Sequence, residues 1–281
     1  MDHVRKWVEE SGYGASLGVR LEALSEHEAR LALPFQQANS NPGNALHGGC
    51  AASLGVIGAQ AVARAALGAE AGPFHTASLQ VSYLAAAIGE DVTAQATLLR
   101  RGKELVFVLV EVDRPDGKPI AHVTATLRGR FGASPPALVR SAGDHGESDP
   151  GTMGPHIGKM SYASSRGLHV EHMTGGTSRI TLPNSAANAD GDGGQHEGAV
   201  LALLDTTGAM AAWAETGPGP YKASTPALQA RFFGAPMNED LVAYGRMLQR
   251  DGEALFNEVE GVGRESGLVY ATASVLYRIV I

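Results

Sequence analysis

The sequence predicts an α+β protein made of two tandem copies of one domain, each with a long buried helix packed on an antiparallel sheet. Three observations lead to this prediction. The chain repeats itself at one fixed offset, each copy contains one long apolar segment, and several strand-like segments follow it in both copies.

The internal repeat aligns without gaps. His47 and His196 lie 149 positions apart, and the same offset pairs Tyr13 with Tyr162. It also aligns TASLQVSYLAAAIGED at 76–91 with TPALQARFFGAPMNED at 225–240. One register held over such a length indicates a duplication.

The stretch between the copies, GASPPALVRSAGDHGESDPGTMGPH, is rich in Gly, Pro, Ser and charge, as is typical of a linker. We therefore expect an N-terminal domain at residues 1–131, a linker at 132–159 and a C-terminal domain at 160–281. Each copy then has the usual size of a small domain.

The elements are expected in the same order in both copies. VRKWVEES predicts a short helix, and ARLALPF and SRITLPN each predict a strand. After a loop comes the apolar helix that begins at the histidine. The segments ASLQVSYLA, DVTAQATLLRRG, ELVFVLVEVDRPDGKPI and AHVTATLRGRF then predict further strands, with a hairpin turn at RPDG. The helix CAASLGVIGAQAVARAAL is apolar on every side, so the sheet and the other copy's helix are its natural covers.

Composition limits the class of function. A content of 44% hydrophobic and 18% charged residues indicates a globular protein, and a net charge of −7 argues against a nucleic-acid partner. A single cysteine, Cys50, favours a reducing compartment, so we expect a cytoplasmic protein, and the first residues lack the apolar core of a secretory signal. The uncharged run Ala45–Ala63 contains His47 and Gln60, which favours a buried helix over a membrane span.

Two motifs resemble a known family. NPGNALHGG at 41–49 resembles the N-P-x-G-x-x-H-G-G signature of hotdog-fold acyl-CoA thioesterases of the phenylacetyl-CoA thioesterase type. HEGAVLALLDTTGAMAAW at 196–213 resembles the helix of that family, with its Asp nine residues after the His. The resemblance implies a double hotdog, in which a curved sheet wraps each central helix. It further implies that acyl-CoA is the partner, that its thioester is hydrolysed, that neither metal nor cofactor takes part, and that chains pair as homodimers.

Distance requires that such a site be shared between the copies. Nine residues of helix separate His47 from Val56 by roughly 13 Å. A catalytic group must come within about 3 Å of its target. One helix cannot supply both parts, and the resemblance implies that two helices packed in opposite directions do so.

The resemblance implies one complete site with residues from both copies. Asn41 and His47 would hold the thioester, while Gly48 N–H at a helix N-terminus would polarise its carbonyl. Asp205 would act as general base or nucleophile, and Thr225 would orient the water.

The second site would combine Asp190, His196 and Glu197 with Val56 and Thr76. Val56 cannot accept a proton, and Glu197 would put negative charge where an oxyanion must form. We therefore expect this site to be inactive.

The same residues also have structural interpretations. Gly48, and Gly49 to which we assign substrate binding, would equally allow close helix packing. A histidine at a helix start is often structural, Asp205 could be a hydrogen-bonded buried carboxylate, and Thr225 could be an ordinary strand residue.

Two further groups of residues are open to both kinds of interpretation. Cys50 is either a thiol of lowered pKa or a small buried apolar residue. Candidates for the phosphates of coenzyme A, or else ordinary surface cations, are Arg100, Arg101, Arg128 and Arg130.

Two other functions stay open at this point. One is a non-catalytic module that binds acyl-CoA or regulates through it. The other is a hotdog hydratase or dehydratase, for which the expected Asp-x4-His pattern is absent at the helix start.

Overall fold

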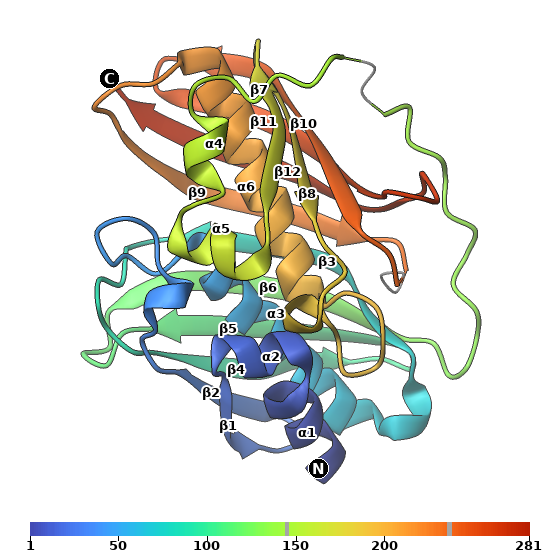
Figure 1. Ribbon diagram of the computed structural model, residues 1–281. Helices are drawn as coiled ribbons and strands as arrows, with labels where there is room; N and C mark the ends of the chain where they lie inside the picture. The colour runs from blue at the N-terminus through green and yellow to red at the C-terminus, as the bar shows by residue number, and fades with distance from the viewer. Residues whose placement is uncertain (144–145, 235–237) are drawn as a thin grey trace.

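The computed structural model describes residues 1–143, 146–234 and 238–281. It confirms the α+β class: two long helices, α3 (Gly48–Leu67) and α6 (Glu197–Thr216), pack on one large antiparallel sheet (Figure 1). The first copy forms one half of the molecule, drawn in blue to green, and the second copy forms the other, drawn in yellow to red.

Both halves follow the predicted order of elements. Around α3, the N-terminal half contains α1 (Asp2–Glu10), α2 (Gly12–Leu17), β1 (Arg20–Leu24), β2 (Glu28–Leu33), β3 (Phe74–Tyr83), β4 (Val92–Arg101), β5 (Leu105–Asp113) and β6 (Pro119–Gly129). Around α6, the C-terminal half contains α4 (Gly154–Ile157), α5 (Ser161–Arg166), β7 (His169–Thr174), β8 (Thr177–Leu182), β9 (Lys222–Phe232), β10 (Leu241–Asp251), β11 (Ala254–Gly263) and β12 (Val269–Val280). Short 3-10 turns at Gln37–Asn39, Ala69–Ala71 and Ala186–Asn188 complete the described elements.

The strands of the two halves join into one sheet. Their order is β1-β2-β4-β5-β6-β3-β9-β12-β11-β10-β8-β7, so β3 and β9 meet at the centre. The pair is antiparallel, with Leu79 opposite Ala230 and Ser82 opposite Ala227. The sequence predicted a sheet in each copy but not this junction, because strand periodicity does not identify which edges pair.

The two central helices have no polar face. Almost every residue of α3 is buried, as its apolar sequence predicts. By length and composition α3 could cross a membrane, yet 89% of that segment is buried inside the protein. Its covers are the sheet and α6, as expected from the sequence.

α3 and α6 cross in opposite directions at small residues. A methyl group built on Gly49 would lie 2.6 Å from the Ala202 side chain, and one built on Gly198 would lie 2.8 Å from Ser53 Oγ. Residue numbers rise along one helix as they fall along the other, so the helices are antiparallel. Each helix start therefore lies against the middle of the other helix.

A pair of repeat-related tyrosines joins the halves on the pseudo-twofold axis. The Tyr13 and Tyr162 hydroxyls are 2.8 Å apart, and Tyr13 also hydrogen-bonds Ser53 Oγ at 2.8 Å. Each ring stacks on the histidine of the opposite repeat: Tyr162 on His47 and Tyr13 on His196. The tyrosines thus tie both helix starts to one buried contact.

The predicted linker, 132–159, is partly ordered on the second half. Val139 accepts the Val269 N–H, and Arg140 forms an isolated bridge with Leu268. Residues 144–145 of the linker lie outside the described residues. Helix α4 falls inside it, at the place in the repeat that α1 occupies in the first copy. The domain boundaries at 131 and 160 stay a prediction.

The tyrosine contact predicts non-additive stabilities. Tyr13→Phe leaves the buried Tyr162 hydroxyl without its partner and should lower the free energy of unfolding by about 1–3 kcal/mol. Tyr162→Phe should lower it less, because Tyr13 keeps Ser53. Urea unfolding of the double variant should show a loss smaller than the sum of the two. Strict additivity would contradict a direct hydrogen bond.

Candidate active site

The start of α3 presents one unused backbone donor. His47 caps the helix: its Nδ1 accepts the Gly49 N–H at 2.9 Å and its carbonyl accepts the Cys50 N–H at 2.9 Å. Among the described residues, the Gly48 N–H has no acceptor. It is therefore a free hydrogen-bond donor at the positive end of a helix dipole, a position that favours a negatively charged group nearby.

The Asp205 carboxylate, on α6, lies beside this donor. A methyl group built on Gly48 would lie 3.1 Å from Asp205 Oδ2. Standard backbone geometry then puts Oδ2 within about 6 Å of the Gly48 nitrogen. The two central sequence-predicted residues, from different repeats, are thus brought together across the helix crossing.

Thr225, on β9, holds the other carboxylate oxygen. Its hydroxyl donates to Asp205 Oδ1 at 2.8 Å. Burial raises the pKa of Asp205 to about 6, and the Thr225 hydrogen bond opposes part of that rise. Asp205 Oδ2 is left facing Gly48 on a carboxyl group that changes charge near neutral pH.

Tyr83, at the end of β3, also lies in this site, and sequence reasoning missed it. The same methyl on Gly48 would lie 3.5 Å from Tyr83 Cε1. Burial, and then the nearby Asp205 charge, raise the pKa of the Tyr83 phenol. The 149-residue offset pairs Tyr83 with Phe232, and this loss of a hydroxyl in the other copy was the signal available.

The remaining predicted residues of the first site have other local partners. The His47 ring stacks on Tyr162 with centroids 4.1 Å apart, and burial lowers its pKa to about 4, so it is neutral at pH 7. Asn41 N–H donates to the Ala45 carbonyl in the loop that leads to the helix. Gly49 packs on Ala202 and its N–H is taken by His47, so its predicted role in substrate binding gains no support from the geometry.

Cys50 is a buried structural residue. Its thiol contacts the Asn39 carbonyl oxygen at 3.5 Å, and burial raises its pKa. The apolar interpretation of this cysteine holds, and the alternative of a lowered pKa is wrong, because desolvation outweighs the helix N-terminus.

At the second site, the side chains that would face a substrate form hydrogen bonds within the protein. Glu197 stands where Gly48 stands in the first repeat, and its carboxylate accepts the Thr76 N–H at 2.8 Å and the Gln60 amide at 2.7 Å. Burial raises the pKa of Glu197. The Thr76 hydroxyl is buried beside this carboxylate and helps to lower the Glu197 pKa, but it forms no hydrogen bond of ordinary geometry among the described residues. Val56 replaces the acid that accepts the equivalent hydroxyl in the first site.

A second layer of contacts closes this site. Arg64 donates to Gln60 Oε1 at 3.1 Å, pairs with Asp192 at 2.7 Å and lies over the Trp7 ring at 4.2 Å. Trp7, from α1, stacks on His196 and donates to Asp190 Oδ1 at 3.0 Å. Burial lowers the pKa of His196, so it too is neutral. The side chains of the predicted second site are therefore used in contacts with one another.

The four candidate arginines are not gathered at Asp205. Arg128 pairs with Glu104 at 3.0 Å and lies opposite His75, next to Thr76 of the second site. Arg130 approaches His75 Nε2 at 3.4 Å, whereas Arg101 reaches Glu26 at 4.0 Å on the surface and Arg100 is exposed. Their candidacy as phosphate ligands of a coenzyme A bound at the first site therefore gains no support.

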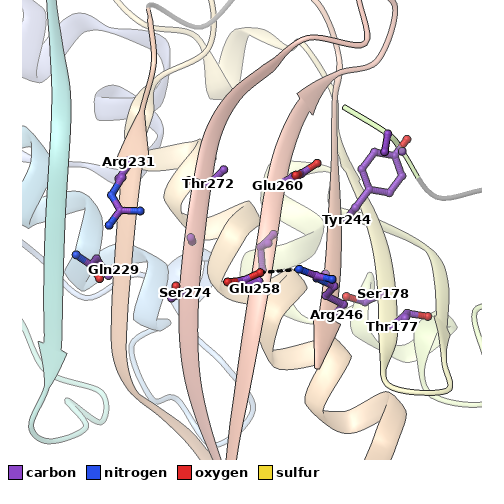
Figure 2. A pocket seen from close by; sticks show the side chains of 15 residues that line it. Thr177, Ser178, Gln229, Arg231, Tyr244, Arg246, Glu258, Glu260, Thr272 and Ser274 are labelled. Atoms are coloured by element: carbon purple, nitrogen blue, oxygen red, sulfur yellow. Dashed lines mark hydrogen bonds and ion pairs between the residues drawn. The ribbon is translucent and has the colours of Figure 1, made fainter. Parts of the chain in front are cut away.

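A cavity of about 660 Å³ lies on the outer face of the second half, away from the helices (Figure 2). It is lined by residues of β8 to β12 and of the linker, such as Ser178, Arg231 and Glu260, with Arg246 paired to Glu258 at 2.9 Å. Asp205, Gly48 and Tyr83 take no part in it.

The two equivalent threonines predict opposite outcomes for the same substitution. Thr225→Val removes the hydrogen bond that lowers the Asp205 pKa, so that pKa should rise above about 6. Thr76→Val removes an unpartnered hydroxyl and should leave the free energy of unfolding unchanged or raise it by up to about 1 kcal/mol.

The measurements are a carbon-13 NMR titration of the Asp205 carboxyl and urea unfolding of both variants. An unchanged Asp205 titration in Thr225→Val would contradict the hydrogen bond. A destabilised Thr76→Val would show that its hydroxyl has a partner after all.

Comparison with known proteins finds relatives of both the sequence and the fold. The family model described as the acyl-CoA thioesterase N-terminal domain matches residues 36–128. A Halobacterium salinarum protein named as a candidate esterase is 34% identical over 136 residues, which cover 46% of this chain and 88% of that protein. The match thus spans most of the relative but about one repeat of this chain.

Solved structures match both repeats together. A TesB protein of Mycobacterium avium subspecies paratuberculosis has a TM-score of 0.66 at 15% identity, covering 96% of this chain and 100% of that one. A candidate thioesterase II of Thermobifida fusca has a TM-score of 0.66 at 17% identity, covering 96% and 97%. Acyl-CoA thioesterase II TesB2 of Mycobacterium marinum has a TM-score of 0.63 at 13% identity, covering 97% and 98%. These likenesses establish the double-hotdog fold.

Proposed function

The chain belongs to the hotdog-fold acyl-CoA thioesterases, and we propose that it hydrolyses the thioester of an acyl-CoA at one site, between the start of α3 and the middle of α6. Asp205 supplies the acid–base or nucleophilic group, and the Gly48 N–H polarises the thioester carbonyl. The equivalent position at the start of α6 does not turn over substrate.

One observation carries this proposal. Asp205 Oδ2 lies 3.1 Å from a methyl built on Gly48, so a carboxylate oxygen lies close to a residue with a free helix N-terminal N–H. Hydrolysis of a thioester needs both a polarised carbonyl and an activated attacking group. At the second site, Val56 and the hydrogen-bonded Glu197 remove both.

The charges at the site fit this chemistry. Asp205, with a pKa of about 6, is mostly ionised at pH 7 and still basic enough to take a proton. As a general base it would accept a proton from water while the C–O bond forms. As a nucleophile it would form that bond itself, and water would hydrolyse the acyl–Asp205 anhydride that C–S cleavage leaves. In either case the C–S bond breaks, and coenzyme A leaves as the thiol or thiolate. Thr225 fixes the carboxylate by its Oδ1 and leaves Oδ2 for either role.

Asn41 and His47 keep their proposed part in holding the thioester. Because burial keeps His47 neutral, its Nε2 can contribute a hydrogen bond without adding charge next to Asp205. A binding module without turnover is the main competing function, and a hydratase or dehydratase is the third.

The central test is Asp205→Asn. We expect thiol release from acyl-CoA, measured with a thiol reagent over a panel from acetyl to palmitoyl and including benzoyl, to fall by about 10³-fold or more, because the amide cannot accept a proton. An unchanged rate would overturn the role of Asp205. Binding of acyl-CoA without any release in the wild type would favour the binding module.

The same variant should be more stable at neutral pH. The folded-state pKa of Asp205 is about 6 and the ordinary value is 3.8, so the unfolded chain ionises first. Wild-type stability should therefore fall as the pH rises from about 4 to 6, by roughly 3 kcal/mol, and then level off. Asp205→Asn should lack this loss, and the two proteins should converge below pH 4.

We further propose that two chains pair as a homodimer in the cytoplasm. Leu248 and Phe256, on the outer sheet face of the second half, are 51% and 44% exposed, and a second chain that covered them would bury apolar surface. Sedimentation velocity should give about twice the chain mass. A monomer at all concentrations would overturn the pairing.

A further inference from the structure

Tyr83 carries a buried hydroxyl for which the described residues supply no partner. Leaving such a group unsatisfied costs about 1–3 kcal/mol of stability. Native structures hold few of them, and each calls for an explanation such as a ligand or a catalytic role.

The ring of Tyr83 lies at the proposed catalytic space. A methyl on Gly48 would lie 3.5 Å from Cε1 and 3.7 Å from Cζ of Tyr83, and 3.1 Å from Asp205 Oδ2. Tyr83 directly follows Ser82, which pairs with Ala227 of β9, the strand that also carries Thr225. The Tyr83 ring, Gly48 with its free N–H and the Asp205 carboxylate are thus close neighbours.

The duplicated site provides an internal comparison. The 149-residue offset puts Phe232 at the position of Tyr83 in the second copy, and the site predicted there has Val56 in place of the acid and Glu197 in place of Gly48. The hydroxyl is therefore present only where the acid and the open helix N-terminus are present. If the aromatic ring served packing alone, phenylalanine would fill both positions without leaving a polar atom unsatisfied.

We propose that the Tyr83 hydroxyl is the second donor of the oxyanion hole and hydrogen-bonds the thioester carbonyl oxygen together with the Gly48 N–H. When the new C–O bond forms, the π electrons of the carbonyl move onto this oxygen, and the two donors share the negative charge. When the C–S bond breaks, the carbonyl re-forms and Tyr83 still has its proton. This inference rests on the proposed thioester hydrolysis and names a residue of that same site.

Other roles for the hydroxyl fit the contacts less well. A structural bond to Asp205 is absent, since Thr225 holds Oδ1 and Tyr83 bonds neither oxygen. A role as proton source is disfavoured because burial and the Asp205 charge both raise the pKa of the phenol. Donation to an oxygen that gains charge requires only that the proton stay in place.

The test is Tyr83→Phe, with Tyr270→Phe as the matched control. Tyr270 has an equally buried and unpartnered hydroxyl, on β12, and the charged group that influences its pKa is Glu239 and not Asp205. Removing either hydroxyl breaks no hydrogen bond, so both variants should unfold at the wild-type urea concentration or above it. With the acyl-CoA that is cleaved fastest, Tyr83→Phe should lower kcat by about 10²-fold, with KM changed less than about threefold. Tyr270→Phe should leave both unchanged.

A second measurement works without turnover. The probe is a ketone analogue with CH₂ in place of the sulfur, made for the acyl-CoA that binds best. Its carbonyl stretch, followed by infrared difference spectroscopy, should shift to lower frequency on binding to the wild type and lose part of that shift in Tyr83→Phe. Tyr270→Phe should retain the full shift.

The outcomes separate this inference from the proposed function. A normal kcat and an unchanged carbonyl shift in Tyr83→Phe would overturn the role of Tyr83 while hydrolysis through Asp205 stands. A wild type that binds the analogue but hydrolyses nothing, with a carbonyl shift that depends on Tyr83, would overturn the hydrolytic function and keep Tyr83 as a carbonyl donor. A raised KM with normal kcat, or failure to bind the probe, would also overturn the proposal.

Discussion

The close antiparallel crossing of α3 and α6 is the constraint on which the rest of the structure depends. At Gly49 there is no space for even a methyl group, which would lie 2.6 Å from the side chain of Ala202. Helices packed this tightly in opposite directions must bring each N-terminus to the middle of the other. A donor at position 48 and an acid at position 205 therefore lie close together, although they are 157 positions apart in the sequence. Two further contacts between the halves hold the helices in this arrangement. They are the β3–β9 pairing within the sheet and the hydrogen bond between Tyr13 and Tyr162.

The two ends of the helix pair have diverged in opposite senses. At one end, polar groups are left without partners: the Gly48 N–H, the Tyr83 hydroxyl and one oxygen of a carboxylate with a raised pKa. Each of these reduces stability. At the other end, Glu197, Gln60 and Arg64 form a continuous set of hydrogen bonds beneath Trp7. The start of α3 thus keeps the groups that could react with a substrate, whereas the start of α6 forms contacts that stabilise the fold.

Much of this arrangement could be predicted from the sequence, for identifiable reasons. The offset between His47 and His196, the two long apolar helices and Asp205 in the interior of one of them define the repeat, the class and the fold. Tyr83 could not be found by motif, because exchange with Phe232 preserves the ring and the apolar pattern. Trp7 and Arg64 escaped notice because their acidic partners follow more than a hundred residues later. Gly49 was assigned to substrate binding because the motif contains it, whereas the structure uses its small size for helix packing.

Glu197 also has a consequence for how this asymmetry could arise. In a pair of identical single-repeat chains, one codon determines both helix starts, so a glutamate there would enter both sites at once. Joining the copies in one chain gives every symmetry-related position two independent codons. A substitution that would disable a symmetric dimer then affects one half only and can be selected for the contacts it forms. The fused chain is in effect a heterodimer whose two subunits cannot be exchanged or separately expressed, and its unequal ends are inherited together.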